Sequence, residues 1–273
     1  MSADAKTLLG QQVADFRVEA DALSETLQTL TESDWNATTS FKDWRIKDVV
    51  EHLHFGDTLG TLTLTEPDAY ERLRNEAQRS SLSRLEFTRQ HFGDILGSEL
   101  LERWQAGYAK LCASFADADP DVRLNWVGPG MKPRMFVTAR QMEAWAHGFE
   151  IYDYLGTDRV HHDRIRNIAT LGVRTYGWTF QNRKEIPPGP APHVSLVSPS
   201  GAVWEWNERQ DDNMVSGDAV DFCQVVTQVR NLADVNLAVT GEPANAWMQI
   251  AQCFAGPPEA PPAPGSRAHQ AGR

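Results

Sequence analysis

A helix with two candidate metal ligands on one face is predicted by the stretch Thr138-Ala-Arg-Gln-Met-Glu-Ala-Trp-Ala-His-Gly-Phe-Glu-Ile-Tyr-Asp-Tyr-Leu-Gly156. Glu143 and His147 are four residues apart, so a carboxylate and an imidazole can converge on one point. Thr138 followed three residues later by Gln141 is typical of a capping box and predicts that the helix begins at Thr138. Gly156 predicts its end. A third ligand from another helix would complete a two-His-one-carboxylate site with coordination positions left open for water or substrate.

The spacing alone also allows an arrangement without metal. A Glu-x-x-x-His pair is common on solvated helices, where Glu143 would pair with Arg140 or water and His147 would be a packed histidine. The chain has eight histidines, and three of them lie in predicted loops where they are expected to contact solvent: His161, His162 and His193.

Composition limits the class of protein. The chain has 273 residues, 41% of them hydrophobic, with a formal net charge of −11 and a pI near 5.2. The length suits two domains of ordinary size or one large one. The acidic excess argues against nucleic acid and anionic membranes as partners, but by itself it identifies no substrate. The expected partner is a small-molecule substrate. Without a signal-peptide pattern or a long apolar run, a cytoplasmic protein is expected, and the sequence leaves open whether it is a monomer or a homodimer.

The three cysteines, Cys112, Cys223 and Cys253, are scattered and form no Cys-x-x-Cys pair. The sequence therefore predicts neither a disulfide framework nor a thiolate zinc site. Cys112 and Cys223 lie in apolar helical patterns and are expected in the core.

Helical periodicity dominates the first half of the chain and alternation the second, which predicts an α+β protein. The predicted helices of the first half cover residues 5–31, 44–59, 67–93 with an interruption at 80–83, 98–115 and 138–155. The second half predicts a short helix or turn at 164–178, a hairpin over 193–207, a helix at 217–231, a strand at 235–240 and a helix at 244–254. The Pro-, Ala- and Gly-rich tail, 256–273, is predicted to be disordered.

Two segments carry a family resemblance. Phe41-Lys-Asp-Trp-Arg-Ile-Lys-Asp-Val-Val-Glu-His-Leu53 resembles the first metal element of the DinB-like and mycothiol-dependent maleylpyruvate isomerase superfamily. Glu143-Ala-Trp-Ala-His147-Gly, followed by Asp153-Tyr-Leu-Gly156, resembles its second metal element. The resemblance covers about residues 8–160. Leu171-Gly-Val-Arg-Thr-x-Gly-Trp178 is similar to an uncharacterised metal-binding subgroup of the superfamily.

This resemblance implies a domain organisation and a set of metal ligands. It implies a DinB-like four-helix bundle over residues 1–160 and a smaller sterol-carrier-like α+β domain over residues 161–255. The implied ligands are His52, Glu143 and His147, with Zn²⁺ the usual ion and Fe²⁺ or Ni²⁺ as alternatives. His54 competes with His52, but it lies about 200° further around the helix, so only one of the two can face the bundle centre.

Arg45 is a departure from the family pattern. Relatives often carry Thr or Ser at this position, where the side chain caps the helix, whereas a guanidinium cannot accept that backbone hydrogen bond. Arg45 is therefore expected either to face an anionic ligand or to be solvated.

The resemblance also implies a thiol-dependent isomerase or transferase that uses a low-molecular-weight thiol such as mycothiol on a small unsaturated carboxylate. Asp48 and Glu150 are the candidates for orienting an imidazole of the metal site. Arg230, or failing that Arg174, is the candidate for receiving the substrate carboxylate, with a surface salt bridge as the alternative role. A cleft between the two halves is expected to hold the site, because ligand sites favour domain interfaces.

Two other classes of function remain open. One is a different metal enzyme on the same scaffold, either a hydrolase that uses zinc-bound water or a ferrous oxygenase. The other is a protein without catalytic activity that binds an apolar ligand, in which the metal only braces the bundle.

Overall fold

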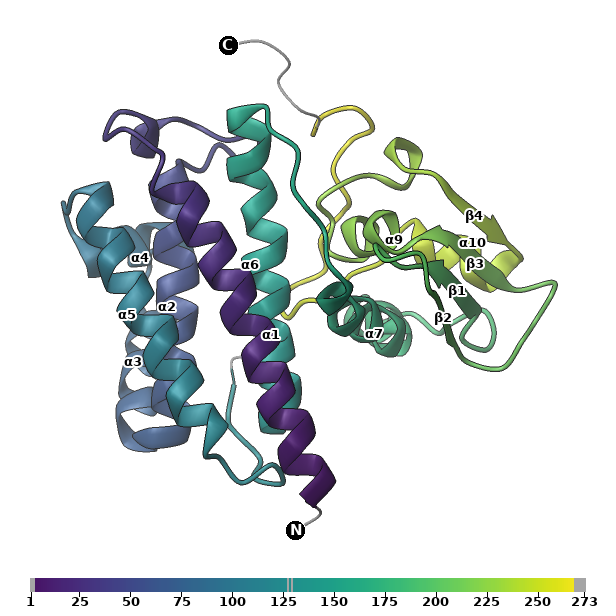
Figure 1. Ribbon diagram of the computed structural model, residues 1–273, viewed down its shortest axis with the longest axis horizontal. Coiled ribbons are helices and arrows are strands. Elements are labelled where there is room, and N and C mark those ends of the chain that lie inside the picture. Colours follow the sequence, from purple (N-terminus) through teal and green to yellow (C-terminus); the bar gives the residue numbers. More distant parts are fainter. Residues whose placement is uncertain (1–2, 127, 129, 268–273) are drawn as a thin grey trace. The chain divides into compact units, whose positions relative to one another are not determined.

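A computed structural model describes residues 3–126, 128 and 130–267 of the chain (Figure 1). It divides into two compact units, Met1–Leu155 and Gly156–Arg273. The first is helical and the second contains a small mixed sheet with helices, so the α+β class is confirmed. The boundary falls five residues before the one that the sequence suggests.

Four long helices form the body of the N-terminal unit (Figure 1). Helix α1 packs against α5 and α6, and α2 also packs against α5 and α6. Aliphatic and aromatic side chains from these helices form one buried core that includes Phe16, Leu53, Trp104 and Phe136. The bounds of the four helices are Ala3–Leu27 for α1, Ile46–Thr65 for α2, Gly97–Ala116 for α5 and Pro133–Leu155 for α6.

Two shorter helices, α3 (Pro67–Arg79) and α4 (Arg84–Phe92), pack against α2. The interruption predicted at residues 80–83 is the break between them. Ser83 caps α4, because its hydroxyl accepts a hydrogen bond from the Glu86 backbone N–H while the Glu86 carboxylate accepts one from the Ser83 N–H. A 3₁₀ turn, η1 (Asp34–Asn36), lies between α1 and α2.

Helix α2 begins without a Ser or Thr cap, and the Asp48 side chain accepts a backbone hydrogen bond at this end of the helix instead. The Asp48 carboxylate accepts the backbone N–H of Arg45 at 2.7 Å and the Arg45 guanidinium at 2.9 Å. Arg89 of α4 donates two further hydrogen bonds to the same carboxylate, at 2.7 and 2.6 Å. Arg45 is therefore paired with the fully buried Asp48, which also links α2 to Arg89 of α4.

Helix α6 begins five residues earlier than the capping-box pattern predicts. Pro133 occupies its first position, where the missing N–H and fixed φ of proline are favourable. Thr138 lies inside the helix, and its hydroxyl donates to the Arg134 carbonyl one turn back. The predicted capping box at Thr138 is therefore wrong. The predicted end is confirmed, because Gly156 follows Leu155 with a φ of 63°.

The C-terminal unit contains a four-stranded sheet in the order β2-β1-β3-β4. The predicted hairpin is confirmed as the antiparallel pair β1–β2, while β1–β3 is parallel and β3–β4 antiparallel. Val194, Leu196, Trp204 and Val215 are buried on one face. The strands are β1 (His193–Val197), β2 (Val203–Trp206), β3 (Met214–Asp218) and β4 (Leu237–Thr240). The helices are η2 (Asp163–Ile165), α7 (Arg166–Arg174), α8 (Tyr176–Asn182), α9 (Ala219–Val226), η3 (Leu232–Asp234) and α10 (Glu242–Met248).

Three predictions for this unit need correction. The helix expected at 217–231 is the shorter α9, because residues 214–218 form strand β3 and Asp218 caps α9 by accepting the Val220 N–H. The closing helix expected at 244–254 ends at Met248. His193, expected to contact solvent, is buried in β1.

The tail also differs from its predicted disorder over residues 256–267. The carbonyl of Glu259 accepts hydrogen bonds from Arg183 and Gln228, and Asn231 donates to the Pro262 carbonyl. Polar side chains of the C-terminal unit thus satisfy the backbone of this proline-rich segment in the absence of regular structure. Residues 268–273 lie outside the described residues.

The helices of the described residues include none with the length and apolar character that a membrane span requires. The likeness of the C-terminal unit to a sterol-carrier-like domain stays a prediction.

Replacing Asp48 by Asn is expected to lower the free energy of unfolding at pH 7 by about 2 kcal/mol. Burial opposes ionisation of Asp48, but hydrogen bonds from Arg89 and Arg45 outweigh it and lower the pKa from 3.8 to about 2. A lowered pKa contributes stability above pH 3.8 that is lost as the pH falls toward 2. Denaturant titrations should show the difference between wild type and variant shrinking below pH 4. A difference that is the same at pH 7 and pH 3 would contradict the ionic role of Asp48.

Candidate metal site

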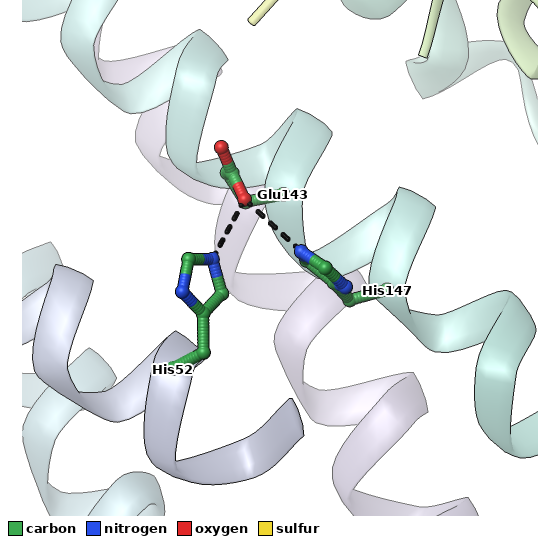
Figure 2. Close-up of side chains that lie close together, drawn as sticks. All are labelled: His52, Glu143 and His147. Carbon is green, nitrogen blue, oxygen red and sulfur yellow. Dashed lines mark hydrogen bonds and ion pairs between the residues drawn. The ribbon is translucent and has the colours of Figure 1, made fainter. Parts of the chain in front are cut away.

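Helices α2 and α6 bring one carboxylate and two imidazoles together (Figure 2). The Glu143 Oε2 atom lies 3.0 Å from His52 Nε2 and 3.5 Å from His147 Nε2. One candidate ligand atom from each of the three residues lies within 4.8 Å of the others. The side chains are 14–22% exposed, so the cluster is mostly buried and keeps some contact with solvent. The structure thus brings the three predicted ligands to one point.

Aromatic rings form a wall of this cluster. The Trp44 indole is parallel to the His147 imidazole within 4°, with ring centroids 6.0 Å apart. Phe41 meets the same imidazole edge-on at 5.1 Å, and Trp44 meets His52 at 5.6 Å. Such contacts restrict the orientations of both imidazoles.

The two aromatic residues lie on a tight turn between η1 and α2. Lys42 and Asp43 both adopt positive φ, 51° and 57°, which is unfavourable for residues with a Cβ. A backbone hydrogen bond from Thr39 N–H to the Trp44 carbonyl, at 2.7 Å, closes the turn. The Lys42 ammonium also lies 5.2 Å from the centre of the Phe41 ring. These interactions hold a strained backbone beside the cluster, as is common at functional sites.

The protonation states suit metal binding. Burial lowers the pKa of His52 from 6.5 to about 4, although the hydrogen bond to Glu143 partly opposes this shift. Burial alone would raise the pKa of Glu143, but hydrogen bonds from His147 and His52 outweigh it and hold that pKa well below its usual 4.5. At neutral pH the cluster therefore offers a neutral imidazole on His52 and an ionised carboxylate, the forms in which these groups bind metals.

The spacing of the donor atoms also fits a metal ion. Ligands about 2.0–2.1 Å from a tetrahedral zinc ion lie about 3.4 Å from one another. The 3.0 and 3.5 Å separations of Glu143 Oε2 from the two imidazole nitrogens are close to that value. Two nitrogens and one oxygen are a donor set that Zn²⁺ and Fe²⁺ both accept. The arrangement could polarise a bound substrate or lower the pKa of a bound thiol or water.

Two side chains that the sequence associates with the site make other contacts: His54, the competing ligand, and Asp48, the expected neighbour. His54 stacks on Phe92, with ring centroids 5.1 Å apart, and is not part of the cluster. Of the two histidines on α2, the structure thus places His52, and not His54, beside Glu143 and His147. Asp48, expected to orient an imidazole, instead binds Arg45 and Arg89. A buried carboxylate takes the strongest charged donors within reach, and here these are guanidiniums.

The remaining candidates lie apart from one another in the sequence. Glu150 is buried in α6, two turns beyond Glu143. Arg174 is exposed at the end of α7 in the C-terminal unit. Arg230 follows α9 by four residues and is only 9% exposed, and its guanidinium donates to the Val229 carbonyl. Their proposed roles stay predictions.

Sequence reasoning missed two features of the site. Phe41 and Trp44 were part of a recognised motif, yet no spacing rule placed their rings on the imidazoles. Arg140 was expected to pair with Glu143 if no metal was bound, but it pairs with Asp57 of α2. A charged residue among the apolar residues of a helix indicates a buried ion pair, and Arg140 and Asp57 are both of this kind. The sequence around each residue does not identify its partner.

The mostly helical N-terminal unit and its candidate His/Glu/His metal site define the class of this protein, a helical bundle with a possible metal centre. Comparisons with known proteins agree with this class. Residues 16–152 match the family described as the mycothiol maleylpyruvate isomerase N-terminal domain. The chain therefore belongs to this family, which confirms the resemblance seen in its sequence.

Curated relatives extend the match to both units. The uncharacterised proteins Rv0036c and MT0041, from two strains of Mycobacterium tuberculosis, are each 34% identical to the chain over 249 residues. These matches cover 91% of this chain and 97% of each relative.

Two solved structures share the fold. They are crystal structures of the mycothiol-dependent maleylpyruvate isomerase and of a variant in which one of its histidines is replaced by alanine, with TM-scores of 0.51 and 0.53. Each match covers 80% of this chain and 88% of the chain in the solved structure. Their identities of 15% and 14% support a common fold and no more.

In the metal-free protein, the His52 imidazole is expected to stay neutral until the pH approaches about 4. Replacing Glu143 by Gln should lower the pKa of His52 further, because the carboxylate stabilises the imidazolium. A ¹⁵N NMR titration of the imidazoles would measure both values. A pKa of 6.5 or above for His52 would contradict the conclusion that burial outweighs the hydrogen bond to Glu143.

Proposed function

We propose that this chain is a metal-dependent enzyme of the thiol-using isomerase or transferase class, with His52, Glu143 and His147 as the ligands of one divalent ion. The observation that carries the proposal is the convergence of these three donors from two separate helices. Zinc is the preferred ion, with Fe²⁺ and Ni²⁺ as alternatives. Three protein ligands would leave a coordination position for a reactant.

The reacting thiol is proposed to come from a low-molecular-weight compound such as mycothiol. The chain's own cysteines are poor candidates, since all three are buried. Burial raises the pKa of Cys112 to about 12 and that of Cys223 well above its usual 9.0. A bound divalent ion would supply the positive charge that keeps an external thiol deprotonated at neutral pH.

The proposed reaction acts on a small unsaturated carboxylate. The thiolate sulfur adds to one carbon of the double bond, the resulting single bond rotates, and the thiolate leaves as the double bond re-forms. Thiol and proton count are unchanged over the cycle, so no oxidant or reductant is needed. Phe41 and Trp44 would limit how a planar substrate can approach the imidazoles, because their rings already cover part of them.

The donor set itself keeps a second candidate open. Two histidines and one carboxylate are also the ligands of ferrous oxygenases and of zinc hydrolases. Turnover that needs Fe²⁺ and O₂, or that proceeds without any thiol, would favour these enzymes. Loss of folding on chelation without turnover would favour a metal that only braces the bundle.

About one divalent ion per chain is expected in protein purified without an affinity tag, as measured by elemental analysis. His52→Ala and His147→Ala should each lose the ion and remain folded, because the apolar core of the bundle does not depend on it. His54→Ala is the matched control on α2 and should keep the metal. Failure of the wild type to bind added Zn²⁺, Fe²⁺ or Ni²⁺ at micromolar concentration would exclude the proposed site.

Arg230 or Arg174 is proposed to receive the substrate carboxylate, since a chain of net charge −11 needs a local cation to hold an anion. Replacing the responsible arginine by Ala should lower kcat/KM by the equivalent of roughly 2–4 kcal/mol while leaving the metal content unchanged. Wild-type kinetics in both variants would refute the carboxylate interaction and leave the metal site unaffected.

A further inference from the structure

A buried ion pair lies beside the candidate metal site on the same two helices. Arg140, one turn before Glu143 on α6, donates from Nε to Asp57 Oδ1 of α2 at 2.8 Å. Its Nη2 donates to the Leu53 carbonyl of α2 at 3.1 Å. Arg140 and Asp57 are only 3% and 1% exposed, so water does not compete for these hydrogen bonds.

The acceptor of this pair is itself fixed. The second oxygen of Asp57 accepts the indole N–H of Trp104 on α5 at 2.9 Å. Asp57 is thus held from two sides. Its carboxylate cannot shift without breaking a buried hydrogen bond to Trp104 or to Arg140. Helices α2, α5 and α6 meet at this carboxylate.

The two acceptors of Arg140 define the position of α2 closely. Leu53 follows His52 directly, and Asp57 is one turn further along the same helix. A rigid, planar guanidinium that reaches both acceptors constrains sliding and rotation of α2 relative to α6. His52 and Glu143 are each within one turn of these contacts, so the same constraint sets their separation.

A glycine makes room for the guanidinium. A Cβ atom on Gly56 would lie 2.6 Å from Arg140 Nη1 and 2.7 Å from its central carbon. Such distances are too short for any ordinary contact, so a side chain at this position would displace Arg140. The α2 surface therefore carries a notch at Gly56 into which the guanidinium fits.

We propose that Arg140 is a positioning residue, which sets the register of α2 against α6 and thereby the distance of His52 from Glu143 and His147. The effect of Arg140 on metal affinity rests on the proposed function. Its effect on the positions of the His52 and His147 imidazoles does not. Metal sites tolerate displacements of only about 0.2 Å in ligand distance, so a small shift of α2 is enough to weaken binding.

The test compares two substitutions that each add one methyl group to α2. Gly56→Ala places the methyl against Arg140, and Gly60→Ala places it 2.7 Å from the Phe136 ring and 3.0 Å from Leu111. Neither changes the charge of the protein, and both replace a helical glycine. Zn²⁺ affinity is measured by competition with a chromophoric chelator, stability by thermal unfolding, and the imidazole ¹⁵N signals by NMR of the metal-free protein.

Gly56→Ala should weaken Zn²⁺ binding by about tenfold or more, the range for residues that orient metal ligands. It should also move the ¹⁵N signals of His52 and His147 in the metal-free protein. Gly60→Ala should keep the wild-type Zn²⁺ affinity and imidazole signals, even if it lowers the melting temperature as much as Gly56→Ala does. Equal effects of the two variants on affinity and signals would overturn the proposal.

Two further outcomes are separable. If wild-type protein binds no Zn²⁺, the proposed function fails, and the imidazole signals of the metal-free variants still decide the role of Arg140. If Gly56→Ala does not fold, Arg140→Lys takes its place, since a lysine keeps the charge but lacks the planar fork that reaches both acceptors. Wild-type imidazole signals in Arg140→Lys would overturn the positioning role.

Discussion

Polar groups buried between the long helices have to be matched across the helix contacts, and this constraint fixes how the N-terminal unit is assembled. His52 meets Glu143, Asp57 meets Arg140, and Gln12 of α1 donates to Gln141 of α6 at 2.7 Å. Apolar contacts tolerate small slides of one helix along another, whereas a buried hydrogen bond is lost within a fraction of an ångström. The pairs therefore select one register, and the candidate metal site depends on that register.

Much of the N-terminal unit could be predicted because its signals are local. Apolar spacing of three and four residues indicated the long helices, and the serines at 80, 81 and 83 indicated the break between α3 and α4. The i, i+4 spacing of Glu143 and His147, with the family resemblance of the motif that contains His52, indicated the three converging residues. These features need only a short window of sequence, and the structure agrees with each of them.

The parts that could not be predicted depend on contacts between distant residues. Strand β3 is short and follows a polar loop, and it forms because β1 offers it a parallel edge some twenty residues away. The tail over 256–267 is ordered by side chains of Arg183, Gln228 and Asn231, which composition cannot reveal. Helical spacing predicts Asp48 near the metal site, but Arg89 of another helix binds its carboxylate. The choice of partner for a buried charge is a tertiary property.

The most direct test of the metal site is X-ray absorption at the zinc edge on Zn²⁺-loaded protein without added thiol. The account predicts only nitrogen and oxygen donors at about 2.0–2.1 Å, with the scattering pattern of two imidazoles, and no bound zinc in His52→Ala. A sulfur donor at about 2.3 Å, or a wild-type zinc content in His52→Ala, would contradict the assignment of His52, Glu143 and His147 as the ligands.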